Sequence, residues 1–137
     1  MPPPLRQITE TAVYVDDLDA AADFYGRVLG LKQLGRQDDR HVFFQAGPEQ
    51  MLLCFIAATT IKGETLTPHG STGPGHLALG IAGHDYEAWR EHLSRCGIKI
   101  ELEQTWERGG RSLYFRDPAG NSVELATPGI WGLPSGW

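Results

Sequence analysis

Two stretches of this chain repeat the same order of features, and this repeat constrains the fold more than any single motif. Residues 10–32 and 76–99 each run from a strand-like segment through a turn and a helical stretch to a glycine and a further strand. A shift of 66 residues (76 − 10) places Glu10 on His76 and aligns the small residues that follow them. We therefore expect two similar modules in one chain.

Each module is predicted to contain one helix. The first helix is expected to begin near Asp17 or Asp19, whose carboxylates can accept hydrogen bonds from exposed backbone N–H groups. It is expected to end at Gly30, because glycine readily adopts the left-handed conformation that stops a helix. The second helix is expected to begin near Asp85 and to end at Gly97. Apolar residues recur at three-to-four spacing in both stretches, which is typical of a helix packed on one side.

The remaining strands are predicted at 32–37, 40–45 and 51–56 in the first module and at 98–103, 110–116 and 121–126 in the second. Asp117, Pro118 and Gly120 occupy the positions that these residues favour in a type I turn, which predicts a hairpin between the last two strands. The fold class is therefore α+β, with two βαβββ modules. The chain divides into module one at 5–56, a linker rich in Thr, Gly and Pro at 57–75, module two at 76–127 and a C-terminal tail at 128–137, all within a single domain.

Three ionisable residues lie in strand-like runs whose same-face neighbours include small residues. They are Glu10, His76 and Glu124. Because side chains alternate along a strand, the apolar residues of each run fill the opposite face. If the three roomier faces converge, they form a pocket with two carboxylates and one imidazole. This set can bind Mn²⁺, Fe²⁺, Ni²⁺, Co²⁺ or Zn²⁺ and leave coordination positions open.

Composition excludes several classes of function. The net charge of −5 argues against a nucleic-acid-binding protein, which needs a basic face. No apolar run approaches membrane-spanning length, and the N-terminus lacks the apolar segment of a signal peptide. Cys54 and Cys96 both lie in apolar patterns and are expected to be small buried side chains, not a disulfide. We expect a cytoplasmic protein with no nucleic-acid or membrane partner.

A set of motifs extends along nearly the whole chain: Val15-Asp16-Asp17-Leu18-Asp19, Phe24-Tyr25, Val28-Leu29-Gly30-Leu31, Gly75-His76-Leu77-Ala78 and Asp117-Pro118-Ala119-Gly120-Asn121-Ser122-Val123-Glu124-Leu125. Together they resemble the vicinal oxygen chelate superfamily, which includes glyoxalases, extradiol dioxygenases, fosfomycin-resistance enzymes and bleomycin-binding proteins. The resemblance implies paired modules that form a cupped mixed sheet around a central pocket. It is specific for the fold and weak for the reaction, because this scaffold hosts several chemistries.

The resemblance also implies a ligand set, drawn from the first and last strands of each module. His76 and Glu124 match the positions of the second module, and Glu10 matches the first-module position where His or Gln is usual. The fourth position, a carboxylate in glyoxalases, falls on Leu53 or Cys54, depending on a one-residue gap. The sequence thus departs from the glyoxalase set twice. It also departs from the two-His, one-carboxylate triad of the iron dioxygenases, because Glu10 stands where they have His.

These features predict a metal-dependent enzyme of the glyoxalase/dioxygenase type that acts on a small molecule with vicinal oxygens. The reaction would be that of a lyase or isomerase, or ring cleavage by a dioxygenase. The metal ligands are expected to be Glu10, His76 and Glu124, and the catalytic residues Glu124, Glu10 and His69. The alternative is a metal-free protein that sequesters a drug or metabolite, as bleomycin-resistance proteins do. An acidic pocket suits a cationic drug, and Glu10 is then an exposed edge residue.

The sequence is compatible with two roles for several further residues. His69, in a Gly/Pro loop, is either a proton shuttle over the pocket or a surface histidine. Trp106, Arg108 and Arg111 either clamp an anionic or aromatic ligand or belong to a solvated hairpin loop. His41 alternates with apolar neighbours and is a candidate pocket residue.

We also expect a homodimer. The open sheet edges of a βαβββ module invite pairing with another module, in the same chain or in a second one. The tail adds apolar side chains at Ile130, Trp131, Leu133 and Trp137, and in a monomer much of this apolar surface would be exposed to water. The tail either packs back over a groove or covers a partner subunit, and the resemblance implies two-fold dimers.

Overall fold

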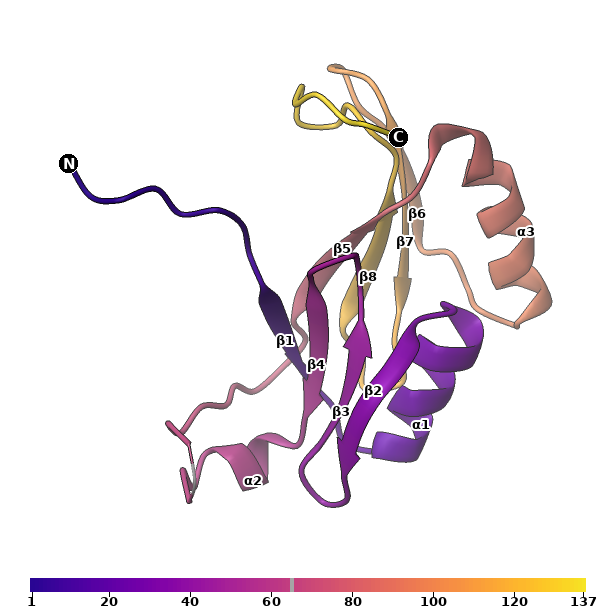
Figure 1. The fold of residues 1–137 in the computed structure, drawn as a ribbon. Helices are drawn as coiled ribbons and strands as arrows, with labels where there is room; N and C mark the ends of the chain where they lie inside the picture. The colour runs from indigo at the N-terminus through magenta and orange to yellow at the C-terminus, as the bar shows by residue number, and fades with distance from the viewer. Residues whose placement is uncertain (65) are drawn as a thin grey trace. The chain divides into compact units, whose positions relative to one another are not determined.

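The computed structural model describes residues 1–64 and 66–137 and contains two compact units, Met1–Thr72 and Gly73–Trp137. Figure 1 shows the order of their elements along the chain. Unit 1 contains β1 (Glu10–Tyr14), α1 (Leu18–Ala22), the π-helical segment η1 (Asp23–Val28), β2 (Lys32–Gln37), β3 (His41–Gln45), β4 (Met51–Phe55) and α2 (Ala57–Thr60). Unit 2 contains β5 (His76–Gly80), the 3₁₀ segment η2 (Gly83–Asp85), α3 (Tyr86–Arg95), β6 (Leu102–Thr105), β7 (Arg111–Arg116) and β8 (Ser122–Ala126).

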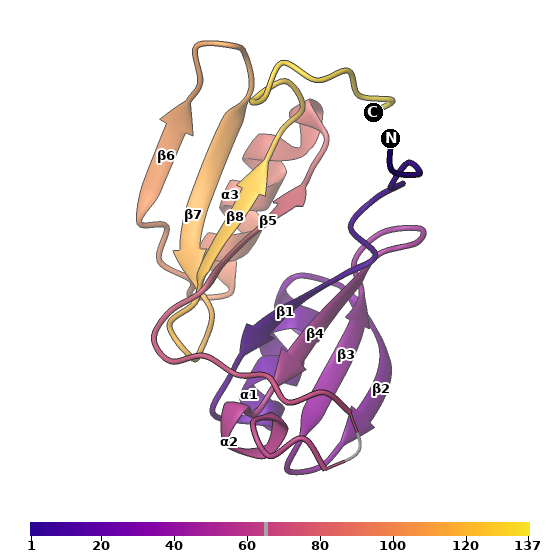
Figure 2. The ribbon, with the colours of Figure 1, turned by 90° about the vertical axis from the view of Figure 1, so that its left-hand side faces the viewer.

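Each unit is built on one four-stranded mixed sheet. The strand order is β1-β4-β3-β2 in unit 1 and β5-β8-β7-β6 in unit 2. The first strand of each unit pairs with the last in parallel, and the other pairs are antiparallel. The α+β class and the repeated strand–helix–strand order predicted from the sequence are thus confirmed. In Figure 2, α1 and α3 each lie against one face of their own sheet and leave the other face open.

The predicted alternation of side chains decides which face is covered. In unit 2, Leu113, Phe115, Val123 and Leu125 are almost completely buried on the α3 side. In unit 1, the buried residues on the α1 side are Val13, Val42, Phe44, Leu52 and Cys54. Residues with the opposite parity face the open side of each sheet. The side chains of interest for function therefore lie opposite the helices.

The helix boundaries follow the capping signals. Asp17 is the N-cap of α1, and its Oδ1 accepts a hydrogen bond from Ala20 N at 3.0 Å. Gly30 and Gly97 have φ of 74° and 73°, the left-handed values expected at a helix end. Asp85 precedes α3 without a side-chain cap bond.

Four local details differ from the sequence-based expectation. The first helix changes from α to π after Ala22, with Leu29 N bonded to Phe24 O, and this wider turn buries adjacent aromatic residues. The strand expected at 98–103 lies at Leu102–Thr105, because Ile98 N bonds back to Leu93 O at the helix end. The start of the expected linker is helix α2. Of the two cysteines, both free, only Cys54 is fully buried, and Cys96 is half-buried.

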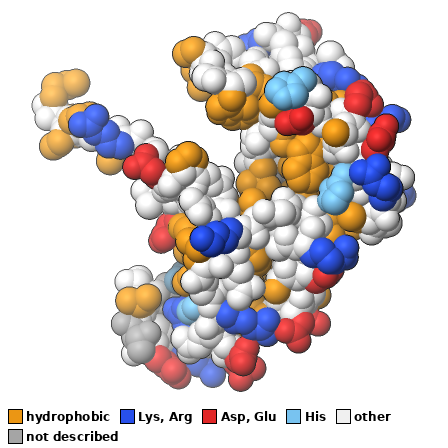
Figure 3. Space-filling view, turned by 45° about the vertical axis from the view of Figure 1, so that its right-hand side comes forward, with side chains coloured by type: hydrophobic (Ala, Val, Ile, Leu, Met, Phe, Trp, Pro, Cys, Tyr) orange, Lys and Arg blue, Asp and Glu red, His pale blue; other side chains and the backbone are white. Residues whose placement is uncertain are grey.

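The surface carries charges of both signs. On the face shown in Figure 3, basic and acidic side chains of the described residues are interspersed, and no large basic patch is visible there. This agrees with the net charge of −5. Among the described residues, no helix is long and apolar enough to cross a membrane.

Candidate functional site

Glu124 is the centre of the polar network in unit 2. It lies on β8, an inner strand of the sheet, and is only 5% exposed. Its Oε1 accepts hydrogen bonds from Ser112 Oγ at 2.6 Å and from Tyr114 OH at 2.9 Å. Burial of an isolated carboxylate is costly, so these two donors account for its place in an otherwise apolar strand.

The register of β7 on β8 creates this network. Tyr114 lies directly opposite Glu124, and Ser112 lies two residues farther along on the same face of β7. The register is set by the predicted turn, in which Gly120 N bonds to Asp117 O at 3.0 Å and Gly120 has φ of 89°. This is the geometry of a three-residue hairpin loop that ends in a left-handed glycine.

The same turn also positions the start of β5. The buried Asp117 carboxylate accepts hydrogen bonds from Asn121 N at 2.8 Å and Asn121 Nδ2 at 2.9 Å. Asn121 Oδ1 in turn accepts from Gly75 N at 2.8 Å, next to His76. The Asp-Pro-Ala-Gly-Asn segment therefore holds the strand that carries Glu124 and the strand that carries His76 in one arrangement.

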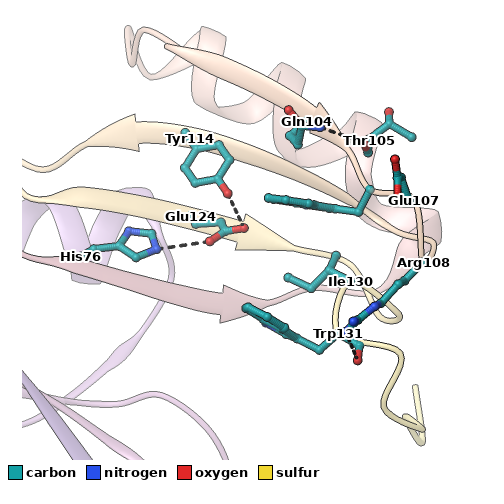
Figure 4. Close-up of a pocket in the computed structure, with 10 residues that line it drawn as sticks. His76, Gln104, Thr105, Glu107, Arg108, Tyr114, Glu124, Ile130 and Trp131 are labelled. Atoms are coloured by element: carbon teal, nitrogen blue, oxygen red, sulfur yellow. Dashed lines mark hydrogen bonds and ion pairs between the residues drawn. The ribbon is translucent and has the colours of Figure 1, made fainter.

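His76 is oriented by the backbone of β8. Its Nδ1 lies 3.1 Å from Ser122 O, and because a carbonyl oxygen only accepts, Nδ1 carries the donated proton. Its Nε2 then faces Glu124 Oε2 at 3.3 Å. About half of the His76 side chain is exposed, whereas the Glu124 side chain is almost fully buried. Figure 4 shows the two side chains pointing toward each other from neighbouring strands.

His76 Nε2 and Glu124 Oε2 are placed as two ligands of one cation would be. With Nδ1 protonated, a neutral His76 presents a lone pair on Nε2 toward an oxygen of Glu124 that also bears lone pairs. Such a contact is attractive only when a proton or a metal cation lies between the two atoms. A ring nitrogen whose other nitrogen donates to a carbonyl is the usual arrangement of a metal-ligating histidine.

Two further side chains support the carboxylate. Trp106 Nε1 donates to Ser112 Oγ at 2.9 Å, which completes a chain from the indole through the hydroxyl to Glu124 Oε1. Burial raises the pKa of the Tyr114 phenol, and its hydrogen bond to Glu124 raises this pKa further. Tyr114 therefore remains a hydrogen-bond donor at physiological pH.

These groups line a cavity of about 590 Å³ in unit 2. Figure 4 shows His76, Tyr114 and Glu124 together at its polar end, called here the inner end. The remaining lining residues, called here the outer end, are Gln104, Thr105, Trp106, Glu107, Arg108, Ile130 and Trp131. A cavity of this size accommodates a small organic molecule.

Unit 1 has a second cavity, of about 910 Å³, on the open face of its own sheet. Glu10 and His69 both line it, together with His41. Tyr14 OH and His69 Nδ1 lie 2.6 Å apart, and the His41 ring is stacked on Phe43 with 3.8 Å between centroids. Burial lowers the pKa of His41, and the nearby Arg40 guanidinium lowers it further. Aromatic rings and polar side chains thus both line this cavity.

Strand register shows which residue replaces Glu124 in unit 1. Ala78 pairs with Glu124 in unit 2, and Ala12 pairs with Leu53 in unit 1. Leu53 lines the unit 1 cavity, whereas Cys54 is completely buried on the helix side. The sequence alone assigned the fourth ligand position to Leu53 or Cys54. The strand register assigns it to Leu53.

The two units also differ in the residues beside this position. Phe43 lies opposite Leu53 in unit 1, where unit 2 has Tyr114 opposite Glu124. His41 occupies the position of Ser112. Unit 2 thus has hydroxyl groups beside its carboxylate, and unit 1 has aromatic rings beside its leucine.

Of the predicted site residues, His76 and Glu124 are brought together in unit 2, and Glu10 and His69 share the unit 1 cavity. The convergence of Glu10 with the other two residues stays a prediction. Within either unit, the described residues contain no group of three or more His, Cys, Asp and Glu side chains placed to hold a metal ion.

The predicted cluster around Gly109 and Gly110 separates into two parts. Trp106 and Arg108 line the cavity. Arg111 does not, because its guanidinium lies 3.7 Å from the centroid of the Tyr86 ring and 3.2 Å from Glu87 on α3.

The sequence analysis did not identify Ser112 and Tyr114 as site residues. It also did not decide whether the tail packs over a groove or covers a partner subunit. The alternation of β7 indicates that both hydroxyls share a face, but only the hairpin register places them on Glu124. In the structure, Ile130 and Trp131 line the unit 2 cavity, so this part of the tail packs over a groove.

This chain is similar to known proteins in both fold and sequence. Residues 7–125 match the Glyoxalase/Bleomycin resistance protein/Dioxygenase superfamily. The crystal structure of lactoylglutathione lyase from Agrobacterium tumefaciens is 36% identical, with a TM-score of 0.90 over 96% of this chain and 100% of that chain. The metallothiol transferase FosB of Bacillus licheniformis is 29% identical over 118 residues, 85% of this chain and 72% of that protein. The glutathione transferase FosA of Serratia marcescens is 26% identical over 121 residues, 88% of this chain and 80% of that protein.

Proposed function

The chain belongs to the Glyoxalase/Bleomycin resistance protein/Dioxygenase superfamily, and we propose that it is a metal-dependent enzyme acting on a small molecule with two adjacent oxygens. The observation that carries the proposal is the contact of His76 Nε2 with Glu124 Oε2 at 3.3 Å, at the inner end of a cavity. Its relatives include a lyase and two transferases, which supports an enzyme without defining the reaction.

The donor set fits a divalent transition metal. A neutral imidazole nitrogen and a carboxylate oxygen suit Mn²⁺, Fe²⁺, Ni²⁺, Co²⁺ or Zn²⁺. We propose His76 and Glu124 as two ligands and Glu10 as the third. Glu124 Oε1 is occupied by two hydroxyl donors, which leaves Oε2 for the metal. Leu53 offers no fourth protein ligand, so positions remain for substrate oxygens or water.

The side chains around the metal site would define the chemistry. A bound metal would supply a Lewis acid that polarises a substrate carbonyl. Glu10 and His69 line a cavity together, and we propose Glu10 as a general base and His69, hydrogen-bonded to Tyr14, as the group that relays the proton. Proton transfer next to a polarised carbonyl is lyase or isomerase chemistry. Ring-cleaving dioxygenation stays the second reaction compatible with this ligand set.

The test is a metal titration of protein stability. Protein dialysed against chelator should gain thermal stability with at least one of the five metals, and the gain should disappear in His76→Ala. His84→Ala is the matched control, because the side chain of His84 is 85% exposed and outside both cavities. Unchanged melting temperatures with all five metals would contradict the proposal.

A second candidate is a metal-free binding protein that sequesters a drug or metabolite. The observation that favours it is the pair Glu10 and Leu53 in unit 1, which departs from the usual ligand positions at two of four places. This protein would bind a small cationic molecule with no response to chelator. Absence of metal in the purified protein, together with chelator-insensitive stability, would support this candidate over the enzyme.

A further inference from the structure

We infer that the unit 2 cavity has an outer subsite that binds an aromatic group of the substrate. This subsite, called here the indole subsite, consists of Trp106, Ile130 and Trp131. The inference rests on the proposed function, because it assigns the inner end of the cavity to the oxygen-bearing part of the same substrate. It names the substrate class as a vicinal-oxygen compound that carries an aryl substituent.

Trp106 is the rigid side of the indole subsite. Its Nε1 donates to Ser112 Oγ at 2.9 Å, and its backbone N bonds to Gly110 O at 3.0 Å. The Ser112 hydroxyl is itself bonded to Glu124 at 2.6 Å. The indole ring is thus held by the same hydrogen bonds that orient Glu124. A group stacked on this ring would lie next to the oxygen-binding end of the cavity.

The tail forms the other side of the indole subsite. Gly110 has φ of 82°, and a Cβ there would lie 2.8 Å from Ile130 Cγ2 and 2.7 Å from Pro128 O. Only glycine permits Ile130 to pack this closely on the hairpin. Arg108 Nη1 also donates to Trp131 O at 3.3 Å, which ties the tail to the same hairpin. Figure 4 shows Ile130 and Trp131 on the side of the cavity opposite Gln104 and Thr105.

The exposure and chemistry of these residues favour an aromatic occupant. Trp131 is 71% exposed and Trp106 is 36% exposed, so both rings present free surface. Glu107 and Arg108 contribute one charge of each sign at this end of the cavity, so the subsite has no net charge to select an ion. Aromatic groups stack favourably on indole rings beyond the gain from buried area. The cavity of about 590 Å³ also exceeds the volume needed by a two-carbon or three-carbon head group alone.

Acetohydroxamic acid and benzohydroxamic acid test this assignment. Both present two adjacent oxygens to a metal, and they differ only in a methyl or phenyl substituent. Their affinities would be measured by calorimetry on protein loaded with the metal that stabilises it most. We expect benzohydroxamic acid to bind at least about tenfold more tightly, because stacking and ring burial act together.

Variants assign the preference to the tail. Trp131→Ala should reduce the ratio of the two affinities to about two or less, mainly because benzohydroxamic acid binds more weakly. Trp137→Ala is the matched control in the same tail, because Trp137 lies over Gly80 and does not line the cavity. Equal affinities in the wild-type protein would overturn the inference and leave the proposed function intact. A dimer lost in Trp131→Ala with the preference retained would also overturn it, because Trp131 then serves a subunit contact.

A metal-independent measurement separates the two proposals. Protein labelled with 5-fluorotryptophan would be titrated with benzyl alcohol, and single Trp→Phe variants would assign the fluorine resonances. The signals of Trp106 and Trp131 should shift, and those of Trp89 and Trp137 should not. If neither hydroxamic acid binds with any metal, the proposed function fails, and these shifts still decide the subsite. No shift of Trp131 would overturn the inference.

Discussion

Replacement of Glu124 by glutamine should separate metal binding from folding. The amide oxygen of Gln can still accept hydrogen bonds from Ser112 Oγ and Tyr114 OH, which lie 2.6 and 2.9 Å from Oε1 in the wild type. The amide NH₂ then faces His76 Nε2 and donates to its lone pair, in place of the 3.3 Å contact between two acceptors. We expect the metal-free variant to unfold with a free energy within about 1 kcal/mol of the wild type, because every buried polar group keeps a partner.

Glu124→Ala should behave differently. It leaves the hydroxyls of Ser112 and Tyr114 without their acceptor on the open face of the sheet. Each such loss costs about 1–3 kcal/mol, so the alanine variant should lose at least about 2 kcal/mol in total. The comparison of the two variants therefore tests whether the carboxylate is needed for its hydrogen bonds or for its charge.

Glu124→Gln should have a large effect on the stabilisation by metal, although its effect on the stability of the metal-free protein is small. At one hundred times the dissociation constant, a metal stabilises wild-type protein by about 2.7 kcal/mol. For a chain of 137 residues this corresponds to a rise in melting temperature of about 10 °C. In Glu124→Gln the rise should fall below about 2 °C, because a neutral amide is a poor ligand for these cations.

Urea unfolding and thermal melts on chelator-treated protein measure both quantities. Glu91→Gln is the matched control, because it makes the same change of charge on a side chain that is 72% exposed on α3. A metal-free Glu124→Gln destabilised by more than about 2 kcal/mol would refute the lone-pair description of the His76 contact. A full metal response in the same variant would remove Glu124 from the ligand set.

Three further results are expected. Ser112→Ala should lower the free energy of unfolding by about 1.5–3 kcal/mol, because it removes a hydrogen bond to a buried carboxylate, and a loss below about 0.5 kcal/mol would contradict the described network. Burial and the hydrogen bond to Glu103 raise the pKa of Tyr86 from 10.0 to about 12. Its contribution to stability is therefore complete below pH 10 and lost as the pH rises toward 12; urea unfolding should show this loss, and Tyr86→Phe should flatten it. Sedimentation equilibrium should give the mass of a dimer at micromolar concentration. Removal of residues 128–137 should restore a monomer if the tail lies in the interface, and a monomeric wild-type protein would contradict the dimer.

Local signals in the sequence determined much of the fold. Period-two alternation placed His76 and Glu124 on the open faces of their strands, because successive side chains of a strand point to opposite sides. Asp17, Gly30 and Gly97 marked helix ends through their own backbone and side-chain chemistry. These features need only a few neighbouring residues, so they can be read without knowledge of which strands pair.

Tertiary structure decided the composition of the site. Ser112 and Tyr114 become partners of Glu124 through the register of a hairpin, and His76 meets it through parallel pairing across 46 residues (122 − 76). Register likewise selected Leu53 over Cys54, two adjacent residues that local sequence could not separate. Strand pairing joins segments far apart in the chain, and a shift of one residue exchanges the two faces. For this reason the sequence identified candidate ligands, and only the assembled sheet showed which side chains support them.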